Sequence, residues 1–400
     1  MQAVLLMAGK NVRFFPLDTS GQKAMFRLYG RPITEYVIDD LRACGIKKFI
    51  IVVRKEDDQI APYFGDGSRF GATIEYVFQE GLEGQGQALL QAIDLIKEEF
   101  IIPNSYHILE KDLFRAVIDR FNNEKLDGLI PGIHEENIGE YGAFRLEGDR
   151  IKGIVEKPKK GAEPSHFRST SAYIFKPDFL KYLKNHADDE FAYEAAISDY
   201  VREKNVRMHE IDKERFMPTL KYPRHLLELR DKLSRTIKGY IHPEAQIAKS
   251  AIIESSAYID EGAKIMDGAH IKGHSYIGKN TLIGDYAIIR NSDIGADTQI
   301  GVRADVARSI IMEGVHFHGE GFIGDSIIGP GTKIGAGFLT ANKRMNREGH
   351  SQGVICGKEV SIGIRVSTMP GVLIGEKATI WPSATVYKDI PHSGTLKQEK

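Results

Sequence analysis

Three residues near the start of the chain are of the types that hold phosphate groups. Gly9 follows a short apolar run, and two cations, Arg13 and Lys23, come shortly after it. A nucleoside triphosphate needs backbone N–H groups that can approach its phosphates, and cations that neutralise the charge developing on a leaving pyrophosphate. Gly9 can supply the first, and Arg13 and Lys23 the second. The segment can therefore bind a nucleoside triphosphate and assist transfer at its phosphates.

The elements around this segment predict an α/β domain. Short β-branched or apolar runs alternate with amphipathic stretches, which indicates βαβ units and a largely parallel sheet with helices on both faces. Ligands of such sheets bind at the carboxyl ends of the strands, so residues 8–23, after the first strand, are the expected site. The strand-like runs are residues 4–7, 47–54 and 72–78, and the helical ones are residues 33–45 and 86–100.

A different period governs the second half of the chain. Isoleucine recurs at every sixth position from Ile241 to Ile289, and after one shortened step the register resumes at Ile294 and again over residues 362–386. A hexapeptide repeat of this kind makes three short flat faces per coil of about 18 residues, and stacked coils bury the aliphatic positions. A β-sandwich would show a period of two and no fixed six-residue register. The pattern predicts a parallel β-helix.

Between the halves, residues 224–238 carry leucines on one face and charges on the other, which predicts an amphipathic connector helix. The predicted organisation is an α/β domain at 1–223, this connector, a β-helix at 239–392 and a polar tail at 393–400 that is expected to fray.

Composition excludes several classes of protein. The chain has 54 Lys+Arg and 55 Asp+Glu, so no global basic field is expected to recruit nucleic acid or an anionic membrane. Cys44 and Cys356 are far apart and have no metal-type spacing, which favours a reduced, cytoplasmic setting. No apolar run approaches the roughly 18 residues of a membrane span, and the N-terminus has no basic region or cleavage site of a signal peptide.

The segment LLMAGKNVRFFPLDTSGQKAMF at 5–26 resembles the signature of sugar-phosphate nucleotidylyltransferases, a Gly-x-Gly-x-Arg loop followed by Pro and then Pro-Lys. QEGLEGQGQALLQA (79–92), YGAF (141–144) and VEKP (155–158) resemble that family's later motifs in the same order. The resemblance implies a Rossmann-like fold and a reaction of nucleoside triphosphate with sugar 1-phosphate that releases pyrophosphate, as in nucleotide-sugar biosynthesis. It implies Arg13 and Lys23 as catalytic residues, and Ala8, Gly9, Gln79, Gly84, Gly142, Glu156 and Lys157 as substrate-binding residues.

The second half resembles the acyltransferase domain of bifunctional enzymes that acetylate glucosamine 1-phosphate and then attach uridylate. Residues 319–342 and 353–375 carry this likeness. It implies a left-handed β-helix, acetyl-CoA as a donor, and sites between neighbouring helices, hence a homotrimer or a dimer of trimers. Asn342 matches a residue of that site, and His318 lies one position from the family's general base, where this chain has Gly319. A one-residue bulge would bring the His318 imidazole into place.

Mg²⁺ is the metal that the resemblance implies, held on the nucleotide phosphates by an Asp. The matching residue is Asp112; alternatively, Asp112 is the N-cap of the following helix. The second metal Asp of the family aligns with Thr219. Because Mg²⁺ usually takes only one or two protein carboxylates together with phosphate and water oxygens, this loss weakens the site without excluding catalysis.

Two functional hypotheses remain open at this level. The first is a UDP-N-acetylglucosamine or dTDP-glucose pyrophosphorylase-like enzyme, with an acetyltransferase-like C-terminal domain. The second is a catalytically impaired paralogue that binds a sugar nucleotide or a partner subunit as a regulator. Departures from both family patterns favour the second hypothesis: Asn11, Lys111, Thr219, Gly319 and Phe322.

Overall fold

The computed structural model describes residues 1–9, 11–80, 84–106, 108, 111–170, 172–189, 191–213, 220–343 and 351–397. They form two compact units: the first comprises Met1–Lys10 with Ile33–Met217, and the second comprises Asn11–Pro32 with Pro218–Lys400. The segment that carries Arg13 and Lys23 thus groups with the second unit, although the predicted division at residue 223 places it in the first domain.

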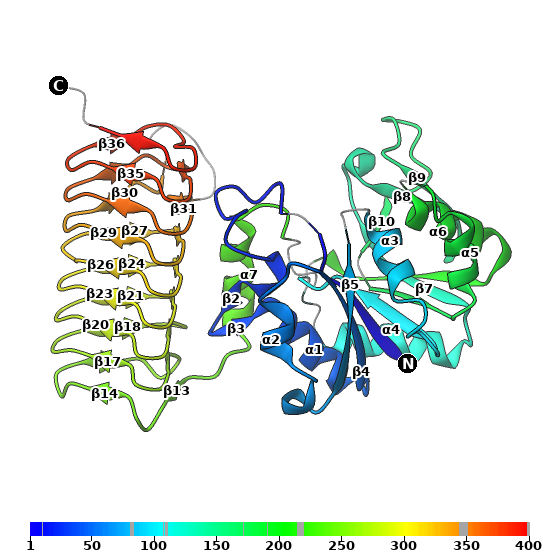
Figure 1. Ribbon diagram of the computed structural model, residues 1–400, viewed down its shortest axis with the longest axis horizontal. Helices are drawn as coiled ribbons and strands as arrows, with labels where there is room; N and C mark the ends of the chain where they lie inside the picture. Colours follow the sequence, from blue (N-terminus) through cyan, green and yellow to red (C-terminus); the bar gives the residue numbers. More distant parts are fainter. Residues whose placement is uncertain are drawn as a thin grey trace. The chain divides into compact units, whose positions relative to one another are not determined.

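One mixed sheet forms the centre of the first unit (Figure 1). Strands β6, β1, β4 and β5 are parallel neighbours, whereas β11 runs antiparallel to both β6 and β7, so the sheet is largely parallel only in its first part. Among the described residues its strands are β1 (Gln2–Leu6), β4 (Lys48–Arg54), β5 (Thr73–Gln79), β6 (Phe100–Pro103), β7 (Gly128–His134), β8 (Gly142–Glu147), β9 (Arg150–Glu156), β10 (Phe167–Ser169), β11 (Ala172–Phe175) and β12 (Val206–Glu210).

Amphipathic helices complete the core of the first unit. Apolar side chains of β1, β4, β6 and β11 pack with those of α3, α5 and α6, as buried β-strands between helices require. Helix α3 ends earlier than predicted, and the chain enters β6 at Phe100 instead of continuing as a helix. The helices are α1 (Ile33–Ala43), α2 (Ile60–Phe64), η2 (Ser68–Phe70), α3 (Gly84–Gln91), α4 (Lys111–Asn123), η3 (Ile138–Glu140), α5 (Phe179–Asn185) and α6 (Ala192–Glu203).

Three parallel sheets wind around the axis of the β-helix in the second unit (Figure 1). The β13 face has β13 (Tyr240–Ile241), β16 (Tyr258–Ile259), β19 (Tyr276–Ile277), β22 (Asp293–Ile294), β25 (Ile310–Ile311), β28 (Ile327–Ile328), β31 (Ile355–Cys356) and β34 (Leu373–Ile374). The β14 face has β14 (Gln246–Ile247), β17 (Lys264–Ile265), β20 (Leu282–Ile283), β23 (Gln299–Ile300), β26 (His316–Phe317), β29 (Lys333–Ile334), β32 (Ser361–Ile362), β35 (Thr379–Ile380) and β37 (Thr395–Leu396). The β15 face has β15 (Ile252–Ile253), β18 (His270–Lys272), β21 (Ile288–Arg290), β24 (Asp305–Ala307), β27 (Phe322–Gly324), β30 (Leu339–Thr340), β33 (Ser367–Thr368) and β36 (Thr385–Val386).

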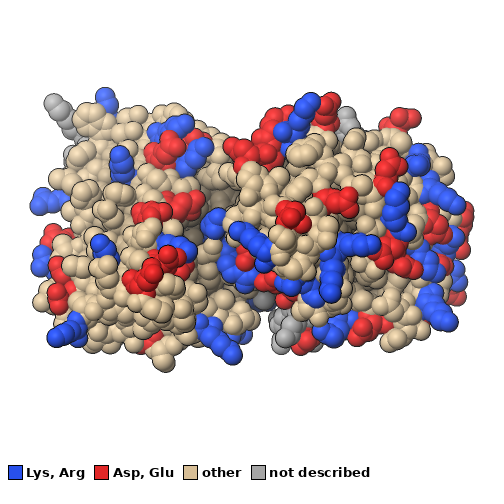
Figure 2. Space-filling view, turned by 60° about the horizontal axis from the view of Figure 1, so that its bottom comes forward, with Lys and Arg blue, Asp and Glu red and all other residues tan. Residues whose placement is uncertain are grey.

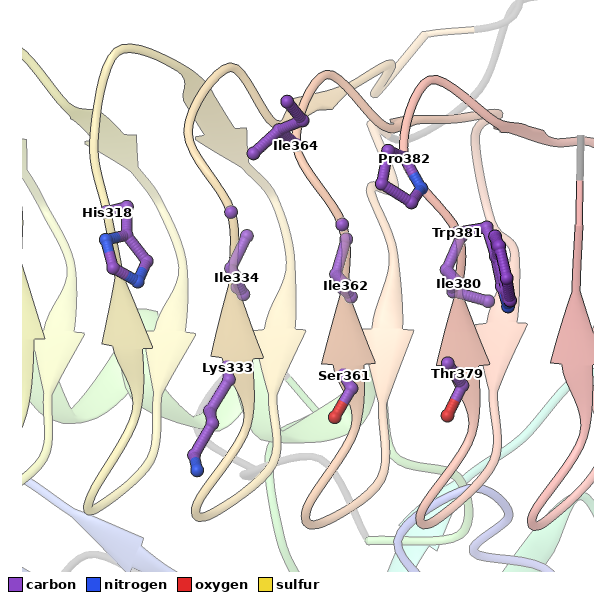
Figure 3. Close-up of a pocket in the computed structure, with 12 residues that line it drawn as sticks. His318, Lys333, Ile334, Ser361, Ile362, Ile364, Thr379, Ile380, Trp381 and Pro382 are labelled. Atoms are coloured by element: carbon purple, nitrogen blue, oxygen red, sulfur yellow. The ribbon is translucent and has the colours of Figure 1, made fainter.

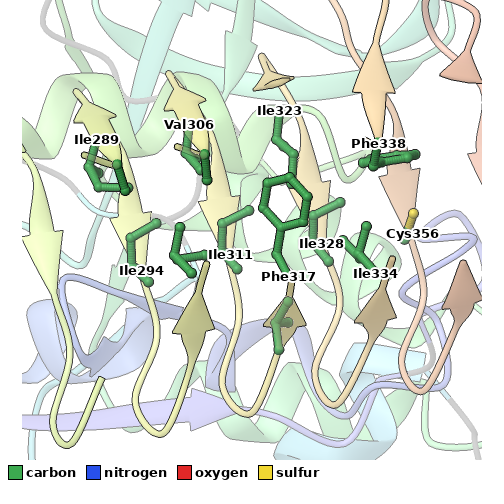
Figure 4. Close-up of a cluster of buried hydrophobic side chains, with 14 of the residues drawn as sticks. Ile289, Ile294, Val306, Ile311, Phe317, Ile323, Ile328, Ile334, Phe338 and Cys356 are labelled. Carbon is green, nitrogen blue, oxygen red and sulfur yellow. The ribbon is translucent and has the colours of Figure 1, made fainter. Parts of the chain in front are cut away.

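The predicted six-residue register is the register of the structure. Ile259 pairs with Ile277 and Ile277 with Ile294, and all three belong to the buried core of the β-helix. Figure 4 shows a part of this core that includes Ile294. The step to Ile294 is one residue shorter than the step before it, which accounts for the break in the sequence repeat. The predicted fold class is therefore confirmed, a Rossmann-like α/β domain followed by a left-handed parallel β-helix.

Small polar residues at the coil corners satisfy the buried backbone. The Ser292 N–H donates to Ser275 Oγ at 3.3 Å, and the Ser309 N–H donates to Ser292 Oγ at 3.1 Å. The ladder continues to Ser326 and from it to the N–H of Val354. An unpaired buried N–H group lowers the stability of the folded state. By accepting these hydrogen bonds, the serine hydroxyls allow tight corners in the buried interior.

The second unit also contains the segment 11–32, with η1 (Lys23–Met25) and the hairpin of β2 (Arg27–Leu28) and β3 (Arg31–Pro32), and helix α7 (His225–Ser234) in the predicted connector. The prediction that residues 393–400 fray is wrong in part, because β37 lies within this range and pairs with β35 through Thr395 and Thr379. None of the helices described is long and apolar enough to cross a membrane. Positive and negative side chains are interspersed over the face shown in Figure 2, in agreement with the near-zero net charge.

Candidate functional site

The loop after β1 offers an open backbone. Ala8 is buried, whereas Gly9 is exposed, and a Cβ added at Gly9 would meet no atom within 4 Å. The space beside the Gly9 Cα is therefore open among the described residues. This is the property that a phosphate-binding loop requires at its glycine. Both residues belong to the first unit.

Arg13 and Lys23 share one electrostatic neighbourhood in the second unit. The Lys23 ammonium lies 4.9 Å from the centre of the Phe14 ring, and Arg13 is exposed. Burial lowers the pKa of Lys23, and the positive charge of Arg13 lowers it further. Two cations that repel each other are poised to bind an anion, because a phosphate relieves that repulsion. The structure thus brings together the two predicted catalytic cations.

Asn11, at the position of the missing second glycine, has a local structural role. Its side-chain amide donates to the backbone carbonyl of Gly21 and so closes the loop across the segment. Phe14 and Leu17 are buried, and successive turn hydrogen bonds link Asn11 to Phe14 and Phe14 to Leu17 at 2.8 and 2.7 Å. These apolar anchors and turns give the loop a defined shape.

The predicted base-binding residues lie where a strand passes to a helix. Gln79 ends β5 and is 2% exposed, and Gly84 opens α3 with a φ of 84°, a left-handed conformation that favours glycine. Residues 81–83 lie outside the described part of the chain. The strand end and the helix start follow the rule for ligand positions in parallel sheets.

The β8–β9 hairpin brings the predicted sugar-binding residues together. Gly142 pairs with Glu156 across the hairpin, and the next residue, Lys157, donates its N–H to Tyr141 O at 3.0 Å. The side chain of Glu156 lies outside the described part of the structure. Its backbone and that of Gly142 are therefore placed side by side as the motif order predicts.

Sequence reasoning missed Arg168, which lies on the neighbouring strand β10. Its guanidinium lies 4.5 Å from the Tyr141 ring, and its Nε is 3.4 Å from a carboxylate oxygen of Glu135. Strand β10 pairs with β8 at Ala143, so Arg168 joins the region of Gly142. The signal that points to it is its position directly before Ser169 and Thr170, where the related family carries its Asn-Thr-Gly motif.

Asp112 lies in the first turn of α4 and is exposed. It is thus inside the helix, one residue beyond its start, and not at the cap position. An exposed carboxylate fits a Mg²⁺ site that phosphate and water oxygens complete. Among the described residues no group of three or more His, Cys, Asp or Glu side chains could hold a metal by itself. Thr219, the other aligned position, lies outside the described residues.

His318 faces a groove on the β14 face of the β-helix. The groove has a volume of about 550 Å³, and Figure 3 shows His318 and Trp381 at its two ends. The remaining lining residues are Lys333, Ile334, Gly335, Ser361, Ile362, Gly363, Ile364, Thr379, Ile380 and Pro382. His318 also borders a second cavity of about 300 Å³, lined in part by Met266 and Val302.

The bulge that would shift His318 into the general-base position is absent from this part of the structure. The His318 N–H donates to Ile334 O at 3.0 Å, and the Glu320 N–H donates to Val302 O at 2.9 Å, so the ladder is regular on both sides. Gly319 has a φ of 101°, and a Cβ there would overlap with the carbonyl oxygen of Val302. The backbone at this position thus excludes a histidine.

Asn342 is held in a hydrogen-bond network, close in sequence to residues 344–350, which lie outside the described part of the chain. Its amide donates to Asp325 at 2.5 Å, and Asp325 also accepts two bonds from Arg308 at 2.7 Å each. The Gln352 N–H donates to Asn342 O at 2.9 Å. The predicted catalytic role of Asn342 stays a prediction, whereas its structural role is clear.

Known proteins match both halves of the chain. A family model described as Nucleotidyl transferase matches residues 2–216, and one described as GMPPB C-terminal domain matches residues 237–308. The bifunctional protein GlmU of Methanococcus maripaludis strain C7 is 33% identical over 410 residues, which cover 98% of this chain and 95% of the relative. The bifunctional sugar-1-phosphate nucleotidylyltransferase/acetyltransferase of Sulfurisphaera tokodaii is 28% identical over 435 residues, which cover 99% and 100%.

Solved structures match the fold. The UTP-bound UGPase from Acinetobacter baumannii superposes with a TM-score of 0.52 at 21% sequence identity. The match covers 61% of this chain and 94% of the other. At this identity the likeness shows the nucleotidyltransferase fold alone.

Proposed function

The chain belongs to the nucleotidyl transferase family, and from this premise we propose that it joins a nucleoside triphosphate to a sugar 1-phosphate and releases pyrophosphate. It is a transferase, and the Sulfurisphaera tokodaii relative that matches it from end to end is named for nucleotidylyltransferase and acetyltransferase activities. The observation that carries the proposal is the pairing of Arg13 and Lys23 in one segment. The two cations repel each other, and a bound phosphate would offset that repulsion.

In the proposed reaction, a phosphate oxygen of the sugar 1-phosphate attacks the α-phosphorus of the nucleotide. The new P–O bond forms as the bond to the pyrophosphate oxygen breaks, and pyrophosphate leaves with the electron pair. Catalysis of this kind depends mainly on positioning and on neutralising charge. Arg13 and Lys23 neutralise the leaving pyrophosphate, and the Gly9 peptide allows the close approach of a phosphate.

The remaining substrate contacts belong to the proposal as well. Gln79 and Gly84 lie on the nucleotide side, and Gly142, Glu156 and Lys157 on the sugar side, where Arg168 adds a further cation. Enzymes of this family generally use a divalent metal. We assign Mg²⁺ to Asp112, where it would neutralise the nucleotide phosphates while Asp112 supplies a carboxylate oxygen.

A release assay tests this function. Purified protein with Mg²⁺ is given UTP, dTTP, ATP, GTP or CTP with the 1-phosphates of glucose, glucosamine, N-acetylglucosamine or mannose, and pyrophosphate is measured. Lys23→Ala is the test variant, and Lys249→Ala, an exposed lysine of the β-helix, is the matched control. Turnover that falls in Lys23→Ala and not in Lys249→Ala supports the proposal. If no pair turns over but a sugar nucleotide raises the melting temperature, the chain is the regulatory paralogue instead.

Acetyl transfer is the second candidate function, and the groove beside His318 favours it, although without the bulge His318 stays one position from the family's general base. A neutral imidazole there can take a proton from the amine of glucosamine 1-phosphate as it attacks the carbonyl carbon of acetyl-CoA, with coenzyme A as the leaving group. Release of free coenzyme A that requires glucosamine 1-phosphate and falls in His318→Ala supports this activity. Release that is unchanged in His318→Ala places the base elsewhere.

We also propose a homotrimer, or a dimer of trimers, in a cytoplasmic setting. Ile364 and Trp381 are 53% and 49% exposed on the β14 side of the β-helix, which is an apolar surface that a second copy of the chain would cover. Cys44 and Cys356 do not form a disulfide with each other, in keeping with a reducing compartment. Light scattering after size exclusion that shows a stable monomer contradicts the assembly.

A further inference from the structure

Residues 11–32, here called the strap, belong to the compact unit of the β-helix. The strap leaves the first unit after β1 and returns to it at α1, and Arg13 and Lys23 lie within it. The two candidate catalytic cations are therefore carried by a segment that packs with the second unit. The contacts between the strap and the β-helix therefore determine the positions of Arg13 and Lys23.

One end of the strap is anchored at β22. The Tyr29 N–H donates to Asp293 Oδ2 at 2.5 Å, and Asp293 is 4% exposed. The Tyr29 hydroxyl lies 3.4 Å from the carbonyl oxygens of Arg230 and His274, and its ring meets that of Tyr276 edge-on at 6.3 Å. This contact joins residues separated by 264 positions in the sequence.

The other end is anchored at the last coils through His392. Its Nδ1 accepts a bond from the Glu376 N–H at 2.9 Å, so in the neutral imidazole the proton is on Nε2. Nε2 lies 3.3 Å from Asp18 Oδ1, close to that carboxylate but without the alignment of a hydrogen bond. The Phe15 ring meets the imidazole edge-on at 5.0 Å.

Glu376 strengthens this second anchor. Burial by itself would raise the pKa of Glu376, but hydrogen bonds from Thr19 and Lys377 and the charge of Lys358 lower it. The Glu376 carboxylate therefore stays ionised and accepts a hydrogen bond from the hydroxyl of Thr19 in the strap. Asp18 and Thr19 thus both contact the end of the β-helix.

The two anchors enclose Lys23 and lie on coils far apart along the β-helix. Asp293 is on β22, and Ile390, two residues before His392, bridges to Ile374 of β34, four strands further along the same face. The strap is thus fixed at two distant points, and the position of its cations depends on both. Catalytic groups must be held within a fraction of an ångström, and misplacement by about 1 Å can cost about a hundredfold in rate.

We propose that the β-helix positions the two candidate cations of nucleotidyl transfer, with His392 and Asp293 as positioning residues that hold Arg13 and Lys23 through the strap. The inference rests on the function proposed above. It adds that nucleotidyl transfer depends on the folded structure of the C-terminal coils of the β-helix. Any change that loosens the end of the β-helix will lower nucleotidyl transfer.

The test compares His392→Ala with the conservative His392→Gln, whose amide keeps a donor near the Nε2 position, and with His270→Ala, a half-buried histidine of the β15 face, as the matched control. His392→Ala should lower kcat at least about tenfold and leave KM for the sugar 1-phosphate within about twofold, because a leaving-group cation acts in the transition state. His392→Gln should recover most of the loss, and His270→Ala should retain full kcat.

A double-mutant cycle separates positioning from a general structural effect. If His392 acts through the strap cations, His392→Ala will lower kcat far less in a Lys23→Ala background than in the wild type. Asp18→Ala removes the contact between Asp18 and His392 from the strap side. This variant tests the proposal if His392→Ala fails to fold. Amide hydrogen exchange should rise in the strap peptides of both variants.

The outcomes separate the two proposals. Absence of turnover by the wild type refutes the proposed function, and this inference with it. Turnover by the wild type with unchanged kcat in His392→Ala and Asp18→Ala refutes the inference alone. Equal losses in the wild-type and Lys23→Ala backgrounds also refute it, because His392 would then act independently of the strap cations.

Discussion

Asp293→Asn isolates the charge at the buried strap anchor, because asparagine keeps an oxygen that can accept the Tyr29 N–H. Burial raises the pKa of Asp293 to about 7, although the Tyr29 N–H and the charge of Arg230 both favour the ionised form. Desolvation is thus the dominant influence on this carboxyl group. A neutral amide at the same position avoids the cost of ionisation altogether.

The sign and size of the effect follow from proton linkage. The folded pKa lies above the unfolded value of about 3.9, so the folded state binds more protons between about pH 4 and pH 7, and stability falls as pH rises through that window. Between pH 5 and a pH above 7, about two pKa units at about 1.4 kcal/mol each correspond to about 3 kcal/mol of stability lost by the wild type. Asp293→Asn does not lose it.

Urea unfolding followed by Trp381 fluorescence measures this directly, since Trp381 is the single tryptophan of the sequence and lies in the β-helix. The advantage of Asp293→Asn over the wild type should grow by about 3 kcal/mol from pH 5 to pH 8.5. Asp297→Asn, an exposed position on the same unit, should show a difference that is nearly independent of pH. An advantage for Asp293→Asn that stays constant or shrinks as pH rises refutes the reasoning.

Three further predictions concern single contacts. The pKa of His186 is raised by bonds to two aspartates, so His186→Ala should lower the melting temperature more at pH 5.5 than at pH 8.5, because the stability from the protonated imidazole is lost as pH rises. Arg308→Ala should destabilise the second unit by about 1–3 kcal/mol in urea unfolding, because Asp325 loses two of its donors. Gly30→Ala should destabilise by more than about 1 kcal/mol, because Gly30 has a φ of 77° and a Cβ would overlap with the Tyr276 hydroxyl.

Each of these has a clear contrary result. An effect of His186→Ala that is equal at both pH values would mean that its bonds to the aspartates contribute no pH-dependent stability. For Arg308, unchanged unfolding would show that Asn342 alone satisfies Asp325. For Gly30, Tyr276→Phe in the alanine background should recover part of the loss, and no recovery would assign the whole cost to backbone strain.

Local patterns in the sequence were sufficient for most of the fold. The period of six in the isoleucines determines the β-helix because each coil repeats the same local geometry, and the columns of Ile259, Ile277 and Ile294 follow directly from it. The order of motifs from Gly9 to Lys157 likewise indicates the nucleotidyltransferase fold. The β8–β9 pairing of Gly142 with Glu156 agrees with that order.

Only the tertiary structure decided which residues surround Arg13 and Lys23. The predicted boundary at residue 223 lies before the amphipathic connector, but a local pattern carries no information about a segment that packs with residues 264 positions away. The same limit applies to Asp293. In the sequence it is one polar residue of a repeat, whereas in the structure its carboxyl group is buried and contacts Tyr29. Sequence periodicity reports local geometry, whereas burial, pKa and the positions of catalytic cations depend on contacts between distant parts of the chain.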